Sequence, residues 1–296
     1  MLFSTVLLLA SSTVSSVLAA PIPFKRNVNV VVARAANTTA SASGGWPQST
    51  GAGDRSSFGI SGGFKETYVQ DVGGQPTLVG NYPKGSYAGS KDPGIAGFIF
   101  EAAGGPDVNL DNAKEAKVSY QVQFPEGFEF ALAGKLPGLY GGSDPKTAGS
   151  CAGGHHDDSC WSARLMWREN GKGELYAYLP TANQHLAVCK GKCDVKYGAS
   201  IGTGSWSFKP GEWTQVTERV KLNDVGKGNG EIEILIGGER KVFVDQLTLR
   251  GDDKGRIRGI MVHTFFGGSS KPDFASPKDQ KAYFKDFALE VTEKLN

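Results

Sequence analysis

Alternation between apolar and polar residues is the main pattern of this chain from about residue 58 to the C-terminus. Short alternating runs are separated by turns rich in glycine and occur at 118–124, 128–132, 213–216, 231–236, 242–244, 259–266 and 282–291. Side chains alternate between the two faces of a β-strand, whereas an amphipathic helix repeats about every 3.6 residues, and no long run has that helical period. The pattern predicts an all-β domain, an antiparallel β-sandwich of jelly-roll type.

The segment 160–180 predicts a β-hairpin whose two faces carry different side chains. One face of the paired arms is apolar and consists of Trp161, Ala163, Leu165, Trp167, Leu175, Ala177 and Leu179. The same pairing gathers four side chains on the opposite face: Ser162, Arg164, Tyr176 and Tyr178. A two-residue turn at Asn170-Gly171 would break this pairing, so we expect a three- or five-residue loop that uses Gly171 or Gly173. The row also fits a purely structural outer face with two tyrosines of high β-propensity.

The first 57 residues predict targeting and linking segments rather than a core. Residues 1–20 are apolar, end in small residues and are typical of a secretory signal peptide, so we expect a secreted, extracellular protein. We interpret residues 21–57 as a pro-segment and flexible linker, with a candidate processing site at Lys25-Arg26. Asn37 begins an N-glycosylation sequon in this linker. The folded domain is expected over residues 58–296.

The four cysteines form two local pairs, Cys151 with Cys160 and Cys189 with Cys193. Four cysteines allow three connectivities, and the local one is favoured because each pair closes a short loop. A zinc site is the competing interpretation, because two histidines lie between the first two cysteines, but the spacing matches no common zinc pattern. We therefore expect two local disulfides that pin loops near the substrate cleft, and no bound metal.

Charge and hydropathy exclude two classes of partner. The formal net charge is +2, and removal of residues 1–26 deletes one lysine, one arginine and no acidic residue, which leaves a neutral chain. A nucleic-acid-binding protein would need a basic surplus. After the signal peptide, no segment is long and apolar enough to span a bilayer, so no membrane partner is expected. No glycine-rich nucleotide-binding motif is present either.

Several segments carry a family resemblance: 135–142, the hairpin at 160–180, and 264–268 followed by 282–287. From about residue 97 to the C-terminus the chain resembles polysaccharide lyase family 14, whose members are secreted alginate or polyuronate lyases with a β-jelly-roll fold. The resemblance implies five functional residues: Lys135, Ser162, Arg164, Tyr176 and Tyr178. We add four candidate substrate-binding residues in or beside these segments: Tyr140, Arg168, His155 and His156.

The five residues implied by the resemblance suit β-elimination of a polyuronate. This reaction removes the C5 proton and expels the C4 oxygen, so the site must neutralise the sugar carboxylate and provide a base. Arg164 offers a planar fork matched to a carboxylate, Lys135 a point charge, and Ser162 a short donor. Two nearby cations should lower the tyrosine pKa from about 10, so Tyr176 or Tyr178 is expected to be the base, with the choice open. The scheme needs no metal or cofactor.

Two other functions compete with a lyase. A glycoside hydrolase would need two carboxylates that flank the bond, and Glu231 and Glu233 stand in an ordinary amphipathic strand. A non-catalytic carbohydrate-binding or wall-associated β-sandwich is the stronger rival, because the tryptophans could stack on sugars. We predict a monomeric lyase that cleaves an acidic polysaccharide. The sequence leaves open whether this is alginate or glucuronan, and whether cleavage is endo or exo.

Overall fold

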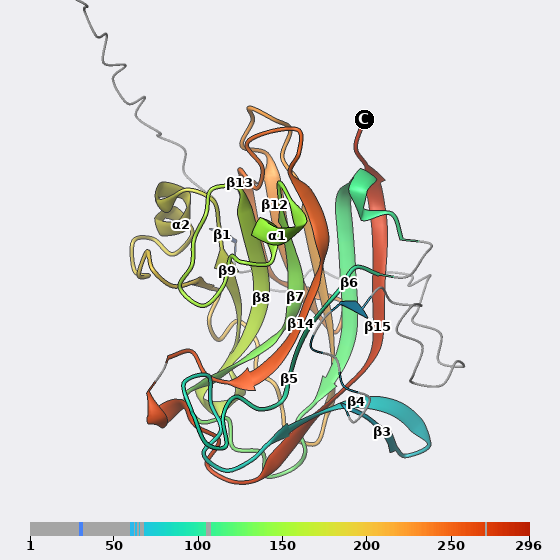
Figure 1. Cartoon of the computed structure of the whole chain (residues 1–296), viewed down its shortest axis with the longest axis vertical. Coiled ribbons are helices and arrows are strands. Elements are labelled where there is room, and N and C mark those ends of the chain that lie inside the picture. Colours follow the sequence, from blue (N-terminus) through green and yellow to red (C-terminus); the bar gives the residue numbers. More distant parts are fainter. Residues whose placement is uncertain are drawn as a thin grey trace, which may run out of the picture.

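The computed structural model describes residues 30–31, 60–61, 63, 65, 68–104, 108–269 and 271–296. These residues form two antiparallel β-sheets packed face to face (Figure 1). The eight-stranded sheet has the order β1 (Val30–Val31), β13 (Glu239–Leu247), β12 (Gly230–Ile236), β11 (Trp213–Lys221), β6 (Ala113–Gln123), β15 (Gln280–Lys294), β4 (Gln75–Tyr82), β3 (Val69–Val72). The seven-stranded sheet has the order β10 (Ala199–Ile201), β9 (Gly173–Tyr178), β8 (Cys160–Arg168), β7 (Ala133–Gly142), β14 (Arg256–Phe266), β5 (Phe98–Ala102), β2 (Ile60–Ser61). The predicted antiparallel β-sandwich is confirmed.

Short helices connect some of the strands. The α-helices are α1 (Pro145–Ala148) and α2 (Ala182–Val188), and the 3₁₀ turns are Leu110–Asn112, Glu169–Gly171 and Pro272–Phe274. The Asp144 carboxylate caps α1 by accepting hydrogen bonds from two backbone N–H groups, both at 3.0 Å. Because α1 lies against β7 and β8 while α2 lies against β10, both helices flank the seven-stranded sheet.

The core between the sheets is rich in aromatic side chains. Trp161 and Trp167 are fully buried there, as the hairpin pattern predicts. The Trp167 ring makes edge contacts with Phe124 and Phe266, at centroid distances of 5.4 and 5.2 Å. Its Nε1 donates a hydrogen bond of 3.0 Å to the Phe130 carbonyl, which satisfies the polar atom of an otherwise apolar ring. The hairpin is therefore anchored through its apolar face.

The register of the β8–β9 hairpin confirms the predicted faces. Ser162 lies opposite Tyr178, and Arg164 lies opposite Tyr176. The loop closes through a 2.7 Å hydrogen bond from the Arg168 N–H to the Lys172 carbonyl, with the 3₁₀ turn 169–171 between them. Asn170 and Gly171 both have positive φ, 59° and 71°, which is the left-handed conformation that such loops require. The loop is thus three residues long and uses a glycine, as predicted.

A β-bulge in β7 brings Lys135 and Tyr140 to the same face of the sheet. In a regular strand, two residues five positions apart point to opposite faces. Here the register against β8 shifts between Leu136 and Gly138, so that Lys135 and Tyr140 point to the same face. A Cβ on Gly138 would lie 2.1 Å from the Ala163 carbonyl oxygen, so only glycine fits here. The buried Glu218 carboxyl of β11 accepts a 3.0 Å hydrogen bond from the backbone N–H of residue 139, which fixes the bulge from the core side.

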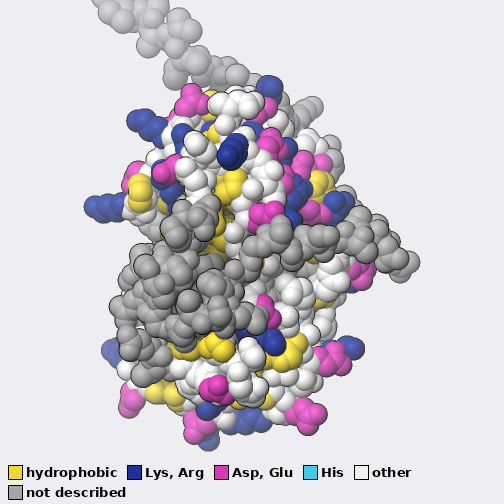
Figure 2. Space-filling view, turned by 90° about the vertical axis from the view of Figure 1, so that its right-hand side faces the viewer, with side chains coloured by type: hydrophobic (Ala, Val, Ile, Leu, Met, Phe, Trp, Pro, Cys, Tyr) yellow, Lys and Arg dark blue, Asp and Glu magenta, His cyan; other side chains and the backbone are white. Residues whose placement is uncertain are grey.

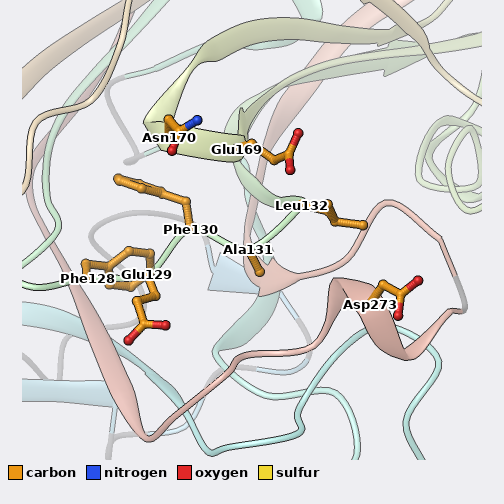
Figure 3. A pocket seen from close by; sticks show the side chains of 8 residues that line it. All are labelled: Phe128, Glu129, Phe130, Ala131, Leu132, Glu169, Asn170 and Asp273. Atoms are coloured by element: carbon orange, nitrogen blue, oxygen red, sulfur yellow. The ribbon is translucent and has the colours of Figure 1, made fainter.

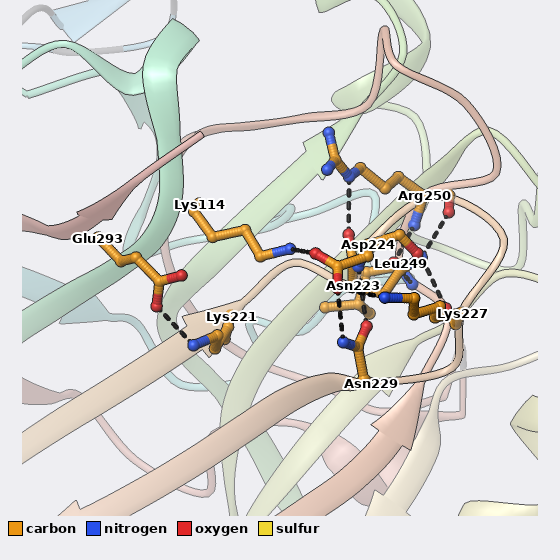
Figure 4. A network of polar contacts seen from close by, with 9 residues as sticks. All are labelled: Lys114, Lys221, Asn223, Asp224, Lys227, Asn229, Leu249, Arg250 and Glu293. Carbon is orange, nitrogen blue, oxygen red and sulfur yellow. Dashed lines mark hydrogen bonds and ion pairs between the residues drawn. The ribbon is translucent and has the colours of Figure 1, made fainter. Parts of the chain in front are cut away.

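Hydrogen bonds and an ion pair connect the turn between β11 and β12 to the segment that leads into β14 (Figure 4). The fully buried Asn223 amide donates to the backbone carbonyls of Asp224, Lys227 and Arg250 and accepts from two backbone N–H groups. The Lys114 ammonium of β6 lies 2.5 Å from the Asp224 carboxylate. Because these contacts join segments far apart in sequence, they stabilise one end of the sandwich.

The N-terminal predictions fall outside the described residues. The signal peptide, the Lys25-Arg26 pair and the Asn37 sequon all lie in stretches that the structure does not describe. Within the part of the chain that it does describe, no helix has the length and apolar character needed to cross a membrane.

Candidate active site

The five residues implied by the family resemblance lie together on the outer face of the seven-stranded sheet. Adjacent strands present them: β7 carries Lys135, β8 carries Ser162 and Arg164, and β9 carries Tyr176 and Tyr178. Each has at most 6% of its surface exposed. The predicted shared face is therefore confirmed, but the side chains are buried under loops rather than open to solvent.

The two disulfides lie in the loops that cover this face. The predicted pairs Cys151–Cys160 and Cys189–Cys193 are both formed, which leaves no thiolate for the alternative zinc site. In the first loop, the Gly154 N–H donates a 3.0 Å hydrogen bond to the Tyr178 hydroxyl. Beyond the second disulfide, the Gly198 N–H donates a 3.0 Å hydrogen bond to the Tyr176 hydroxyl. Each phenol oxygen is therefore held by a backbone donor.

Lys135 occupies an apolar and cationic environment. Its Nζ lies 3.1 Å from the Met166 sulfur and 4.2 Å from the centre of the Tyr176 ring. Burial, followed by repulsion from Arg164 and Arg168, lowers the pKa of Lys135 well below its ordinary value. The expectation that Lys135 supplies a point charge stays a prediction, and its lowered pKa makes the amine easier to deprotonate than an exposed lysine.

The pKa of Tyr176 shifts in the opposite direction to the pKa of Lys135. Burial raises the pKa of Tyr176, with a further increase from Tyr178 and a smaller decrease from the Gly198 N–H and Arg164. The expectation that nearby cations would lower this pKa is wrong for Tyr176, because loss of solvation outweighs the cations. Tyr176 is thus suited to donate a proton, while Lys135 is suited to accept one.

Arg164 has little compensation for its buried charge. Its Nη1 lies 3.4 Å from His263 Nδ1, and its guanidinium carbon lies 6.0 Å from the centre of the Tyr178 ring. Its Nε and Nη2 have no hydrogen-bond partner among the described residues. Burial lowers the pKa of Arg164, although the group stays charged at neutral pH. A buried guanidinium with two unpaired donors is a site for a planar anion.

The nearby acidic residue does not neutralise Arg164 or Lys135. The fully buried Glu174 carboxylate accepts hydrogen bonds from Arg168 at 2.6 Å, Ser200 at 2.9 Å and Thr203 at 2.5 Å. Arg168, a candidate substrate-binding residue, is therefore held in an ion pair and offers no free fork in this structure. Arg164 is therefore left without a carboxylate partner among the described residues.

The remaining candidates lie around the edge of the same face. Tyr140 lies opposite Ser162, and burial together with Glu101 raises the pKa of Tyr140 to about 12. The Ser162 hydroxyl donates a 2.7 Å hydrogen bond to the Cys151 carbonyl, so it is not the free donor expected from the sequence. The His156 ring lies 4.6 Å from the Tyr178 ring, whereas His155 is exposed in the same loop.

From the sequence, His263 was weighed as a candidate but a structural role was favoured, so it was not placed among the site residues. This residue is buried on β14, whose outward positions include Met261, His263 and Phe265. The alternation of β14 gives this outward phase, but only the strand order places β14 next to β7 and brings His263 to Arg164. The sequence therefore gives the outward position of His263, but it does not show which strands are the neighbours of β14.

A separate pocket of about 410 Å³ lies at the hairpin end of the sheet (Figure 3). Its lining includes three acidic residues, Glu129, Glu169 and Asp273, and none of the five residues described above. Three carboxylates would repel an acidic polysaccharide. We therefore take the face around Arg164 as the candidate active site.

Comparisons with known proteins show the family to which the chain belongs. A family model described as polysaccharide lyase 14 matches residues 70–287. The PL-14 alginate lyase from Aplysia kurodai is 33% identical, with a TM-score of 0.69, over 78% of this chain and 90% of that chain. The alginate lyase vAL-1 from Chlorella virus is 26% identical, with a TM-score of 0.66, over 79% of this chain and 93% of that chain. A comparison with curated proteins gives no match. The chain belongs to polysaccharide lyase family 14.

Proposed function

We propose that this protein is a secreted lyase that cleaves a β-1,4-linked polyuronate, of glucuronan or alginate type, by β-elimination. The buried Arg164, with its Nε and Nη2 unpaired among the described residues, is the observation that carries the proposal. A uronate carboxylate supplies the planar anion that this fork lacks. The alginate lyases from Aplysia kurodai and Chlorella virus support this substrate class.

Arg164 binds the carboxylate in the ground state and stabilises it further as C5 loses its proton. The elimination breaks the C5–H and C4–O bonds and forms a C4=C5 double bond, so negative charge spreads onto the carboxylate before the C4 oxygen leaves. A guanidinium held in a site of low dielectric constant stabilises this charge without reorganisation. Neither step requires a metal or an organic cofactor.

Two groups divide the proton transfers. The neutral amine of Lys135 accepts the C5 proton, because its pKa is lowered, and the phenol of Tyr176 donates a proton to the leaving oxygen, because its pKa is raised. The scheme expected from the sequence, with Tyr178 or Tyr176 as the base, is the alternative mechanism. Nζ of Lys135 lies 4.2 Å from the Tyr176 ring, so both groups can reach one sugar.

The proposed secretion and the proposed polysaccharide partner are supported by different features of the chain. The apolar residues 1–20 and the two disulfides support secretion, and Asn37 is the proposed glycan site. The acidic polysaccharide is the expected partner of a monomeric enzyme. The carbohydrate-binding rival loses support, because Trp161, Trp167 and Trp206 are buried and do not present rings to a sugar chain.

A panel of polyuronates tests the proposal. Purified protein is mixed with polymannuronate, polyguluronate, glucuronan and a neutral glucan, and the ultraviolet absorbance of unsaturated uronate ends is followed with time. We expect absorbance to rise with at least one polyuronate and not with the neutral glucan. Product lengths then separate endo from exo cleavage. Binding of a polyuronate without any rise in absorbance would identify a carbohydrate-binding protein instead.

A further inference from the structure

Arg164 has a single hydrogen-bond partner among the described residues, the ring of His263 on β14. Arg164 Nη1 lies 3.4 Å from His263 Nδ1. On the other side of the ring, His263 Nε2 lies 3.5 Å from an oxygen of Glu101 on β5, an ion-pair distance that is long for a hydrogen bond. Strands β8, β14 and β5 of one sheet, with β7 between β8 and β14, thus carry a connected row of arginine, histidine and carboxylate.

We propose that His263, backed by Glu101, is a positioning residue that orients the Arg164 guanidinium for the substrate carboxylate. The inference rests on the proposed function and adds a residue to it. Arg164 donates from Nη1, so Nδ1 of His263 must carry a lone pair and Nε2 must carry the proton. That Nε2–H faces Glu101, which favours this tautomer.

The geometry also determines which edge of Arg164 remains free. A guanidinium presents two edges for bidentate binding, one formed by Nη1 with Nη2 and the other by Nε with Nη2. His263 engages Nη1, while Nε and Nη2 have no hydrogen-bond partner within the described site. The edge formed by Nε and Nη2 is therefore available for bidentate binding of a carboxylate. Rotation of the guanidinium away from His263 would present a different edge and lose the match to a carboxylate.

The surrounding charges keep His263 neutral. Burial lowers the pKa of His263, and the positive charge of Arg164 on β8 lowers it further, as does that of Lys135 on β7 when Lys135 is protonated, while Glu101 on β5 raises it. A protonated His263 would lose the acceptor for Arg164 and place another cation beside it. Glu101 is partly exposed, so it supports the ring without forming a fully buried ion pair.

Substitutions at His263 test the role through kinetics. His263→Phe keeps the ring volume but has no acceptor, and it should lower kcat/KM for the cleaved polyuronate by about 10- to 100-fold, mainly through KM. His263→Gln can accept from Arg164 and donate toward Glu101, so it should restore kcat/KM to within a few-fold of the parent. Gln121→Leu, which removes one side-chain hydrogen bond to Asp286 in the eight-stranded sheet, is the control and should leave the parent kcat/KM nearly unchanged. A folded His263→Phe variant with parent kcat/KM would overturn the proposal.

Nitrogen NMR of the histidine side chains gives a second test that needs no turnover. In the parent at pH 7, the His263 signals, assigned by their loss in His263→Gln, should show an unprotonated Nδ1 and a protonated Nε2. Glu101→Gln should lower the His263 pKa, and Arg164→Ala should raise it. A protonated Nδ1, or a pKa that neither variant moves, would overturn the inference. An inactive parent with the expected tautomer would instead contradict only the proposed function.

Discussion

Two arginines, one on the outer side of each sheet, differ in what surrounds them. Arg219 on β11 forms ion pairs with three carboxylates, Glu115 at 2.6 Å, Glu231 at 2.6 Å and Glu233 at 2.8 Å. Within the described part of the chain, Arg164 on β8 contacts one histidine and no carboxylate. The pKa of Arg219 is raised because these bonds outweigh its loss of solvation, whereas burial lowers the pKa of Arg164. The charge of Arg219 is therefore balanced by carboxylates, whereas the charge of Arg164 is not.

This difference separates a structural face from a functional one. On the side of the molecule shown in Figure 2, basic and acidic side chains are interspersed, as on an ordinary solvated surface. Around Arg164, by contrast, basic and aromatic side chains gather without a free carboxylate among the described residues. A buried arginine without an acidic partner has an energetic cost that folding alone does not explain. An unpaired buried charge is tolerated where a ligand supplies the missing partner.

Loss of a proton-transfer group should have the largest effect. Lys135→Met fits the apolar surroundings of Nζ but has no amine, so kcat should fall by about 10²–10⁴-fold. Tyr176→Phe should lower kcat over a similar range through loss of the proton donor. Lys172→Met, at an exposed lysine of the hairpin loop, is the control and should keep parent kcat. If Lys135→Met retains kcat while Tyr178→Phe loses it, the base is a tyrosine, as the sequence predicted.

Replacement of Arg164 should have the second largest effect on activity. Arg164→Ala should lower kcat/KM by about 10²–10³-fold, because one charged donor is lost both in the ground state and in the transition state. Arg164→Lys keeps the charge but not the fork and should be nearly as impaired. The thermal midpoint should not fall, since an uncompensated buried cation is removed. A variant that loses stability in parallel with activity would mean that Arg164 is structural, like Arg219.

Arg219→Ala should show the reverse behaviour. It leaves three carboxylates close together and should reduce the free energy of unfolding by about 2–3 kcal/mol, as measured by denaturant titration. Its kcat and KM should match the parent at a temperature where both are folded. Replacement of Arg240, which also contacts Glu233 but is largely exposed, is the control and should cost much less. Impaired turnover in Arg219→Ala would contradict the division between the two faces.

The sequence predicted the hairpin and its two faces well because both depend on local alternation. Trp161 and Trp167 point to the core, Ser162 and Arg164 point away from it, and the loop uses Gly171. The local disulfides were also predictable, because short loops limit the connectivities. These features need only the period of a strand and the spacing of the cysteines.

The charge states of the site were not predictable in the same way. Whether a lysine beside an arginine stays charged depends on burial, which the strand pattern of Lys135 did not reveal. Arg168 was expected to bind substrate, but Glu174 from the neighbouring strand holds it. A structural role was favoured for His263, because β14 becomes a neighbour of β7 only through the order of strands in the sheet. Tertiary contacts decide these roles.

The smallest effect is expected at the disulfide between Cys189 and Cys193. Its sequence separation of 4 closes a shorter loop than the separation of 9 in Cys151–Cys160. Chain entropy then gives about 2 kcal/mol for the short loop and about 2.6 kcal/mol for the longer one. The double Ala variant at 189 and 193 should therefore lower the thermal midpoint less than the double Ala variant at 151 and 160.

The activity of these two variants also bears on the comparison of the faces. Each disulfide supports a loop whose backbone N–H holds a tyrosine hydroxyl, Gly198 for Tyr176 and Gly154 for Tyr178. We expect loss of either disulfide to change kcat by less than about 10-fold, because strands rather than loops position the side chains themselves. Steady-state kinetics at a temperature where both variants are folded checks this. A loss of turnover as large as that of Lys135→Met would show that the loop cover, and not the sheet, organises the site.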